Sequence, residues 1–120
     1  MIYAFLNLLL SKEKKMTNCI QIQWTSSSIE EARKIGYALV ENKLVACVNI
    51  LPHVESIYSW EGKIESDQEV EVLLKTDESH FEEIKSYIEK HASYDVPAIL
   101  AFPVLAGNAD YLSWINQVTT

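Results

Sequence analysis

Residues that mark special architectures are scarce in this 120-residue sequence, which has three glycines, three prolines and two cysteines. The glycines, at positions 36, 62 and 107, are isolated from one another, so the sequence lacks a glycine-rich loop that would bind phosphate. Cys19 and Cys47 form no Cys-x-x-Cys pair and build no disulfide framework, so we expect reduced thiols in a cytoplasmic protein. A Gly-x-Ser-x-Gly motif and an obvious Cys–His pairing are also absent, so we expect a protein that is not an enzyme.

Positive charge is scarce as well. Ten lysines and arginines stand against seventeen aspartates and glutamates, which gives a net charge of −7. Residues 1–16 hold three lysines and one glutamate, so residues 17–120 keep seven basic and sixteen acidic side chains, a net charge of −9. Such a surface repels the phosphate backbone of nucleic acids and the headgroups of anionic membranes. We therefore expect neither a nucleic-acid partner nor a membrane partner.

The sequence has one long apolar run at its amino terminus, and that run is short for a membrane span. Residues 1–10 are nearly all apolar, but ten residues are too few to cross a bilayer. Lysines follow the run instead of preceding it, which is the reverse of a secretory signal. We expect residues 1–16 to be an N-terminal extension, either disordered or upstream of a true start at Met16, with a weak membrane-targeting segment as the alternative. Residues 17–120 then form a single domain.

The remaining sequence alternates between strand and helix periodicities. Apolar and polar residues alternate strictly from Cys19 to Trp24, which predicts a strand. Ser28 and Glu31 fit a capping box that opens a helix ending near Lys43. We expect strands at residues 19–24, 44–60, 63–75 and 96–104, and helices at residues 28–43, 77–91 and 109–118.

Local signals set the shape of the central pair of strands. Pro52 lacks the N–H that a strand residue donates, so we expect a bulge or bend there. Glu61 and Gly62 predict a tight hairpin turn, because glycine takes the positive φ that such a turn needs. Glu69 and Glu71 are two residues apart, so they share one face of the returning strand, and that face is typical of one exposed to solvent.

The order β-α-β-β-α-β with a terminal helix predicts an α+β domain. It is the order of the ferredoxin-like sandwich, a four-stranded antiparallel sheet with two helices on one face. The central hairpin is long, about 15 residues on each side, and a strand rises about 3.3 Å per residue whereas a helix rises about 1.5 Å. One layer of helices cannot cover such strands, so we expect the excess hairpin to pack against another subunit.

Four stretches carry a family resemblance: Leu-Val-Ala-Cys-Val-Asn-Ile at 44–50, Ser-Ile-Tyr-Ser-Trp-Glu-Gly-Lys-Ile at 56–64, Leu-Lys-Thr at 74–76 and Tyr-Leu-Ser-Trp-Ile at 111–115. Tyr-Asp-Val-Pro at 94–97 matches part of a further segment, His-Pro-Tyr-Glu-x-Pro-Glu. With these stretches the sequence resembles the CutA divalent-cation tolerance proteins from about Ile20 to Ile115. The resemblance implies a ferredoxin-like homotrimer whose three sheets close edge to edge around a threefold axis. It also implies a copper or other divalent-cation tolerance function with no organic cofactor.

The chain departs from this family at two positions. Ala92 stands where the family usually has a histidine, and Ala98 stands where it usually has a glutamate. Both positions lie in the part of the family that is associated with metal or ligand binding. We therefore expect any site for Cu²⁺ or another divalent cation to be weak.

Two residues are candidate metal ligands. His91 lies next to Ala92 near a helix end, and imidazole suits copper, although a histidine there also satisfies the carbonyls of the last helical turn. Cys47 is the weaker candidate, because a cysteine in an apolar strand usually serves as a small core residue.

The resemblance also brings a set of aromatic and basic side chains to clefts between subunits. A lysine among aromatic rings would hold a small anionic ligand, and the alternative is that the rings only bury area at a trimer interface. These residues are Tyr58, Trp60, Lys75, Tyr94 and Trp114. We expect a non-enzymatic divalent-cation tolerance protein; the alternative is a trimeric small-molecule sensor resembling PII-type signalling proteins.

Overall fold

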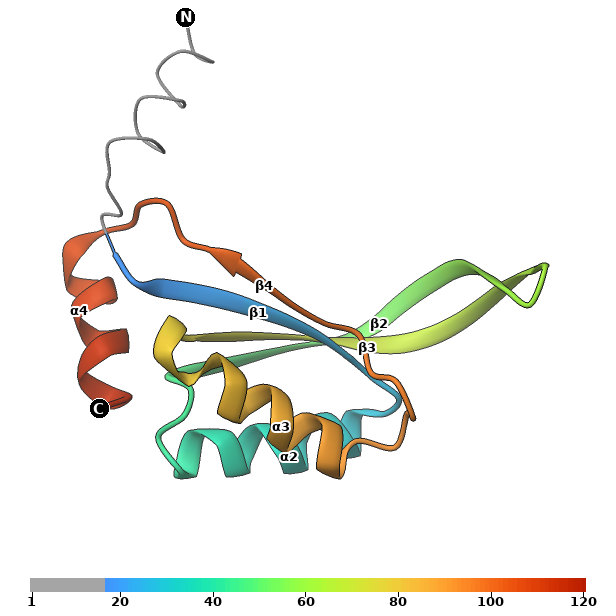
Figure 1. Ribbon diagram of the computed structural model, residues 1–120, viewed down its shortest axis with the longest axis horizontal. Helices are drawn as coiled ribbons and strands as arrows, with labels where there is room; N and C mark the ends of the chain where they lie inside the picture. Colours follow the sequence, from blue (N-terminus) through green and yellow to red (C-terminus); the bar gives the residue numbers. More distant parts are fainter. Residues whose placement is uncertain (1–16) are drawn as a thin grey trace, which may run out of the picture.

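The structure, a computed structural model, describes residues 17–120, and the predicted extension of residues 1–16 lies outside this range. Figure 1 shows two helices below a sheet, a third helix at one end, and a hairpin that projects at the other end. The elements are β1 (Cys19–Ser26), α2 (Ile29–Glu41), β2 (Cys47–Trp60), β3 (Lys63–Asp77), the short 3-10 helix η1 (Glu78–His80), α3 (Phe81–His91), β4 (Ile99–Pro103) and α4 (Ala109–Val118).

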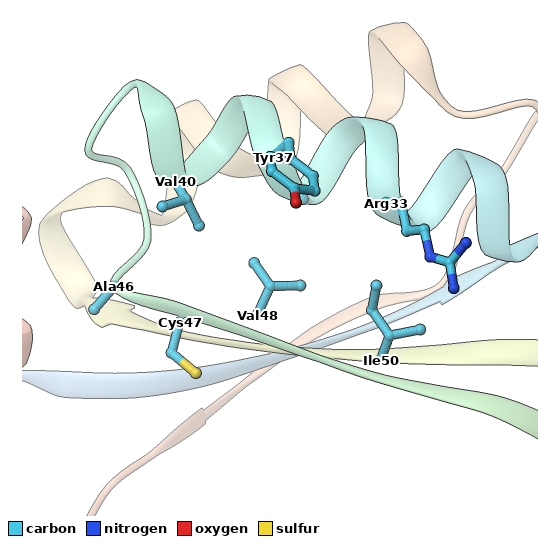
Figure 2. Close-up of a pocket in the computed structure, with 8 residues that line it drawn as sticks. Arg33, Tyr37, Val40, Ala46, Cys47, Val48 and Ile50 are labelled. Carbon is cyan, nitrogen blue, oxygen red and sulfur yellow. The ribbon is translucent and has the colours of Figure 1, made fainter.

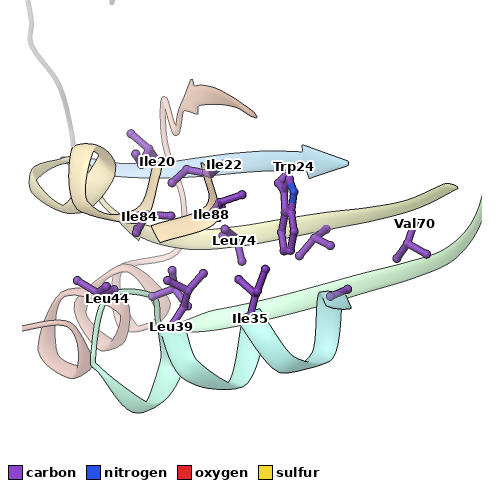
Figure 3. Packing of buried hydrophobic residues seen from close by; sticks show 13 residues of the cluster. Ile20, Ile22, Trp24, Ile35, Leu39, Leu44, Val70, Leu74, Ile84 and Ile88 are labelled. Carbon is purple, nitrogen blue, oxygen red and sulfur yellow. The ribbon is translucent and has the colours of Figure 1, made fainter. Parts of the chain in front are cut away.

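The four strands form one antiparallel sheet in the order β2-β3-β1-β4. Helices α2 and α3 cover one face of this sheet, and apolar side chains fill the space between the two layers (Figure 3). Trp24, Leu39, Leu74 and Ile84 are fully buried there. The predicted α+β architecture, a four-stranded antiparallel sheet with two helices on one face and a terminal helix, is confirmed.

Alternation along the strands assigns residues to the two faces of the sheet. Trp24 of β1 and Val72 and Leu74 of β3 point toward the helices and are buried. Residues one position away point to the opposite side, which we call the open face. On this face the Thr25 hydroxyl donates to Glu71 Oε1 at 2.9 Å, across the β1–β3 pair.

Helix α2 begins where the capping signal predicts. The Ser28 hydroxyl accepts a hydrogen bond from the Glu31 N–H at 3.1 Å, which satisfies one of the free donors of the first turn. The helix ends at Glu41, two residues before the predicted end. Lys43 takes a φ of 61°, in the left-handed region that an α-helix cannot continue through.

Strand β2 begins three residues later than the apolar run predicts. Leu44 and Val45 are buried, but their N–H groups donate to Leu39 O at 2.9 and 3.3 Å and not to a neighbouring strand. Cross-strand bonding starts at Ala46, whose N–H donates to Lys75 O at 2.8 Å, and residue pairing starts at Cys47, opposite Lys75. An apolar run therefore indicated burial correctly while overestimating the length of the strand.

The β2–β3 hairpin has the predicted two-residue turn. Glu61 and Gly62 take φ values of 48° and 78°. Two positive φ values in a two-residue loop are those of a type I′ turn, whose twist matches that of the paired strands.

A bulge interrupts β2 at the predicted place. Leu51 pairs with Glu71 and Val54 with Glu69, so three steps along β2 match two steps along β3. Pro52 lies inside this irregularity, where its missing N–H leaves no ladder bond unmade. The extra residue changes the alternation, so Val54 and every second residue after it lie on the open face, as Leu51 does.

Strand β4 is the second edge of the sheet. It spans Ile99–Pro103 and is shorter than the predicted strand, which began at Val96. Pro97 cannot donate to β1, so regular pairing is delayed until the next residues, where Ala98 O accepts from Thr25 N–H at 3.2 Å.

Helix α4 has the predicted bounds and packs against β1 and β3 at the end of the sheet far from the hairpin (Figure 1). Ile115 is buried, and His80 Nε2 donates to Thr119 O at 2.6 Å, which connects the end of α4 to η1. Among the helices of residues 17–120, none is long and apolar enough to cross a membrane.

Candidate functional site

A hollow of about 530 Å³ lies on the open face, where the hairpin leaves the rest of the sheet. Tyr58 and Trp60 of β2 form part of its wall, together with Tyr94 and Val96 from the segment between α3 and β4. An adjoining hollow of about 300 Å³ shares these four residues, so the two form one continuous depression. Three of the five predicted ligand residues are therefore brought together within one chain.

Four carboxylates line the same hollow. Glu65, Asp67 and Glu69 alternate along β3, so the pleat turns all three to the open face at intervals of about 7 Å. Asp95 adds a fourth carboxylate from the segment that precedes β4. No lysine, arginine or histidine is among the described residues that line this hollow, so its wall is strongly negative.

Two tyrosine hydroxyls orient two of these carboxylates. The Tyr58 hydroxyl donates to Asp67 Oδ2, and this hydrogen bond is the main reason that the pKa of Tyr58 is raised to about 12. The Tyr94 hydroxyl donates to Glu69 Oε2 at 2.7 Å. Burial, followed by this hydrogen bond, raises the pKa of Tyr94 to about 12. Both hydroxyls are therefore protonated donors at neutral pH.

Sequence reasoning identified the aromatic wall of the hollow but missed its carboxylates. None of the four acidic residues, Glu65, Asp67, Glu69 and Asp95, was among the predicted ligand residues. The signal was present in β3, where residues 65, 67, 69 and 71 are all acidic at the spacing of one strand face. That pattern was interpreted only for Glu69 and Glu71, and as a solvated face.

The other two predicted ligand residues lie elsewhere in the protomer. Lys75 Nζ contacts Asn49 Oδ1 at 2.5 Å, and Lys75 is six residues beyond Glu69 on β3, or about 20 Å along the strand. Trp114 stacks on Tyr111 of α4 with ring centroids 5.6 Å apart, at the opposite end of the molecule (Figure 1). Within one protomer, the hollow lacks the lysine that the predicted anionic ligand requires.

Cys47, the weaker predicted metal ligand, lies at the start of β2 beside α4. Cys19 and Cys47 are both free thiols; Cys19 is buried and Cys47 is half-buried. Burial, followed by interaction with Cys47, raises the pKa of the Tyr111 hydroxyl. Cys47 Sγ also lies 3.8 Å from Asn49 Oδ1. The thiol therefore has polar neighbours on the open face and is not a purely apolar core residue.

His91, the first predicted metal ligand, is the last residue of α3 and is exposed. Its Nδ1 lies 2.9 Å from Tyr87 O, and its ring stacks on the Tyr87 ring with centroids 4.0 Å apart. A carbonyl oxygen only accepts, so Nδ1 carries the hydrogen and Nε2 keeps the lone pair of the neutral ring. A hollow of about 240 Å³ beside it is also lined by Glu31 and Lys34.

Glu31 has other partners than a metal ion. Its Oε2 accepts from the Ser26 hydroxyl at 2.7 Å, and its Oε1 accepts from the Ser93 N–H at 2.7 Å. Burial acts to raise the pKa of Glu31, but the hydrogen bonds from Ser26, Ser93 and Ser27 outweigh it and lower the pKa. The carboxylate thus holds the segment after α3 against the start of α2.

Within residues 17–120, no group of three or more histidine, cysteine, aspartate or glutamate side chains converges on a point where it would hold a metal ion. The four carboxylates of the hollow are spread along the wall, and His91 and Cys47 lie in different parts of the fold. A tight divalent-cation site needs several ligands at bonding distance of one ion. The described part of a single chain does not provide such a set.

A different surface feature, an apolar groove of about 260 Å³, lies between α2 and the first half of β2 (Figure 2). Tyr37 and Val40 line it from the helix, Val48 lines it from the strand, and Arg33 lies at one end. Gly36 allows the close approach of helix and strand, because a Cβ there would lie 3.1 Å from a Val48 methyl group. The groove borders the unpaired edge of β2.

Comparison with known proteins identifies the family of this chain. The family model of the CutA1 divalent ion tolerance protein matches residues 19–118. The divalent-cation tolerance protein CutA of Thermus thermophilus is 44% identical over 95 residues, which are 79% of this chain and 92% of that protein. The chloroplastic protein CutA of Arabidopsis thaliana is 36% identical over 110 residues, and there the match spans 92% of this chain but 60% of the relative.

Solved structures give the same result for the fold. The crystal structure of CutA from Xylella fastidiosa superimposes with a TM-score of 0.84 at 34% identity, over 87% of this chain and 100% of that chain. The family match over residues 19–118 includes the sheet, α2, α3 and the long hairpin. The chain therefore belongs to the CutA1 divalent ion tolerance protein family.

Proposed function

We propose that this chain is a homotrimeric divalent-cation tolerance protein that binds copper weakly, through His91, and catalyses no reaction. The family to which it belongs supports the tolerance function. We include a cytoplasmic location in the proposal, because both cysteines are free thiols and a reducing compartment keeps them so.

The orientation of the His91 ring carries the metal part of the proposal. A metal-binding histidine usually donates its second ring N–H to a carbonyl or carboxylate, and His91 Nδ1 does so to Tyr87 O. Nε2 is then the ligand atom. With Ala92 beside it and the Glu31 oxygens engaged by Ser26 and Ser93, one imidazole and water are the available ligands. Such a site is weak, and its occupancy falls at acidic pH because the ring must be neutral.

Titration of Cu²⁺ into the full chain tests this site. We expect the His91→Ala variant to bind copper about tenfold more weakly than the parent, or not measurably, with its oligomeric state unchanged. His53→Ala is the matched control, because it removes another exposed imidazole, at the β2 bulge. Equal copper binding by the parent and His91→Ala would assign His91 a purely structural role at the helix end.

The two edges of the sheet carry the trimer part of the proposal. β2 and β4 are unpaired on their outer sides, and exposed edges pair readily with another chain. Large apolar side chains are exposed along these edges and on the hairpin, among them Leu100 at 58%, Phe102 at 44% and Ile64 at 82%. A soluble monomer rarely leaves so much apolar surface in contact with water.

Light scattering on the purified protein tests the assembly. We expect a particle of three times the 13.7 kDa chain mass at micromolar concentration. Leu100→Lys places a charge on the β4 edge and should lower this mass, whereas Ser86→Lys, on the exposed side of α3, should not. A monomer for the parent protein would contradict the trimer.

The hollow on the open face favours a second candidate function, a trimeric small-molecule sensor resembling PII-type signalling proteins. Its volume of about 530 Å³ is far larger than a metal ion needs and lies in the range of organic ligand sites. Calorimetric titration with Cu²⁺, Zn²⁺ and a panel of metabolites separates the two functions. A metabolite that binds more tightly than any of the metals would favour the sensor.

A further inference from the structure

We propose that the hollow beside His91, between α2 and α3, binds copper as a chelate with a small amino-dicarboxylate and not as the bare ion. This inference rests on the proposed copper function of His91, and it names the form in which the metal arrives. Three features carry it: the single ligand atom that His91 offers, the space beside its ring, and the unpaired ammonium group of Lys34.

The hollow lies away from the surfaces that the proposed trimer covers. Helices α2 and α3 lie side by side on one face of the sheet (Figure 1). The residues that line the hollow between them are Glu31, Lys34, Ile35, Tyr87 and His91. The side of α2 that borders the β2 edge carries other residues, among them Tyr37 and Val40. Edge pairing in the trimer engages that other side of α2, so it leaves this hollow open to solvent.

His91 supplies one ligand atom, and Glu31 adds none. His91 Nδ1 donates to Tyr87 O at 2.9 Å, so Nε2 alone is available. The Glu31 oxygens accept from the Ser26 hydroxyl and the Ser93 N–H. Cu²⁺ has the highest affinity for nitrogen and oxygen ligands among the divalent first-row metals, so a small chelator in solution holds it more tightly than one imidazole does. A chelate that keeps one coordinated water still accepts His91, because Nε2 replaces that water with no transfer of an electron or a proton.

The space beside the His91 ring fits a small organic molecule on the metal. The hollow has a volume of about 240 Å³, several times the roughly 30 Å³ that one water molecule occupies in the liquid. It is smaller than the pockets of drug-sized ligands, about 300 to 1,000 Å³, so it suits a molecule of a few carbon atoms. Ile35, which is 3% exposed, and the Tyr87 ring, which stacks on His91, provide apolar surface for methylene groups.

Lys34 selects carboxylates on that molecule. Within residues 17–120, no ion pair joins Lys34 to an acidic side chain. Its ammonium group has three donors and no acceptor, so it favours a ligand that brings carboxylate oxygens. Lys34 and Glu31 together give the lining no net charge. The hollow therefore suits a chelate whose carboxylates neutralise Cu²⁺ better than it suits the doubly charged ion.

Titration of the full chain with Cu²⁺–iminodiacetate, followed by calorimetry and visible absorption, tests the proposal. Iminodiacetate is tridentate, leaves a position on copper for imidazole, and gives a complex without net charge. We expect saturable binding and an absorption band that moves to shorter wavelength as nitrogen replaces water on the metal. His91→Ala should lose most of this band shift. Lys34→Gln should bind the chelate about threefold more weakly, as expected for an exposed ion pair.

Two matched controls isolate the carboxylates and the lysine. Cu²⁺–diethylenetriamine has the same tridentate geometry but only amine ligands, and it keeps both positive charges. Lys34→Gln should bind this complex, and bare Cu²⁺, at least as tightly as the parent does, because a positive charge near the metal is gone. Lys90→Gln removes an exposed lysine that is next to His91 in the sequence but does not line the hollow, and it should leave chelate binding unchanged.

Three results would overturn the proposal. One is equal affinity of Lys34→Gln and Lys90→Gln for Cu²⁺–iminodiacetate, and another is an unchanged band shift in His91→Ala. The third is an equal loss of both copper complexes in Lys34→Gln, which would remove the role of the carboxylates. Bare Cu²⁺ tests the proposed function separately. If the parent and His91→Ala bind the bare ion equally while both His91→Ala and Lys34→Gln weaken the chelate, the copper-ion function fails and the chelate site stands.

Discussion

The two halves of β3 pair with the same neighbouring strand but differ in what covers them. In residues 70–77, Val70, Val72 and Leu74 lie buried under α2 and α3. In residues 63–69, Ile64 is 82% exposed and acidic side chains face the hollow. We call these the covered half and the projecting half. Backbone pairing with β2 extends over both, so pairing defines the hairpin, whereas the packing that stabilises the fold is concentrated in the covered half.

The largest effect is expected from shortening a side chain in the covered half. Leu74→Ala should lower the free energy of unfolding by about 3 kcal/mol, because it leaves a cavity in a fully packed core. Ile64→Ala, on the same strand, removes no packing within the protomer and should cost less than Leu74→Ala, so its cost in the proposed trimer measures how far a partner covers the projecting half. Denaturant unfolding at a fixed protein concentration measures both. A similar loss for the two variants would mean that a partner subunit covers the projecting half as tightly as the helices cover the other.

Hydrogen bonds in the two halves provide a second matched pair. The Thr76 hydroxyl is buried and donates to Leu44 O at 2.6 Å, so Thr76→Val leaves a buried carbonyl without this donor and should cost about 1 to 2 kcal/mol. The Ser66 hydroxyl donates to Glu55 Oε2 at 3.0 Å on the exposed hairpin, where water replaces it. Ser66→Ala should therefore cost less than about 0.5 kcal/mol. Thermal unfolding measures both variants. An equal loss of stability in Thr76→Val and Ser66→Ala would contradict the expected difference between the covered half and the projecting half.

The turn of the projecting half should contribute to stability through its backbone conformation alone. Gly62 has a φ of 78°, and no heavy atom lies within 4 Å of a Cβ built there. Gly62→Ala should destabilise the protein by about 1 kcal/mol, because the strain lies in the dihedral angle and not in a clash. Glu61→Asn is the control, since asparagine accepts the φ of 48° at that position. This variant should have a thermal unfolding midpoint equal to or higher than that of the parent protein.

The smallest effect is expected at Glu31, in a polar contact at the border of the helical layer. Its pKa is lowered in the folded state, so its contribution is present above its ordinary pKa of 4.5 and is lost as the pH falls through the lowered value. The carboxylate is largely exposed, so we expect it to contribute less than about 1 kcal/mol to the free energy of unfolding. Unfolding midpoints measured from about pH 6 to about pH 3 should fall more steeply for the parent than for Glu31→Gln. Parallel curves would show that the Ser26 and Ser93 contacts add no stability.

The sequence was sufficient to predict features that depend on residues close together along the chain. The type I′ turn follows from Gly62, the bulge from Pro52, and the start of α2 from the Ser28 cap. The beginning of β2 was misplaced, because Leu44 and Val45 look like strand residues yet donate back to α2. Burial is readable from apolar character, whereas the partner of a backbone N–H is not.

The candidate site was less predictable, because it depends on contacts between distant residues. Tyr94 meets Glu69 across 25 positions, and nothing local in either residue indicates the other. The single extra residue in β2 decides that Tyr58 lies on the same face as Asp67. Without knowledge of the register, the aromatic and acidic rows appear as two separate patterns.

The bulge at residues 52 and 53 also makes the length of β2 adjustable. Deleting His53 would leave Leu51 opposite Glu71 and Val54 opposite Glu69, with one residue between them on each strand and both partners unchanged. The same deletion between Val54 and Trp60 would move every following side chain to the other face. Relatives of this chain can therefore gain or lose a residue at the bulge without inverting the tip of the hairpin. Variation in length should be tolerated there and rejected a few residues later.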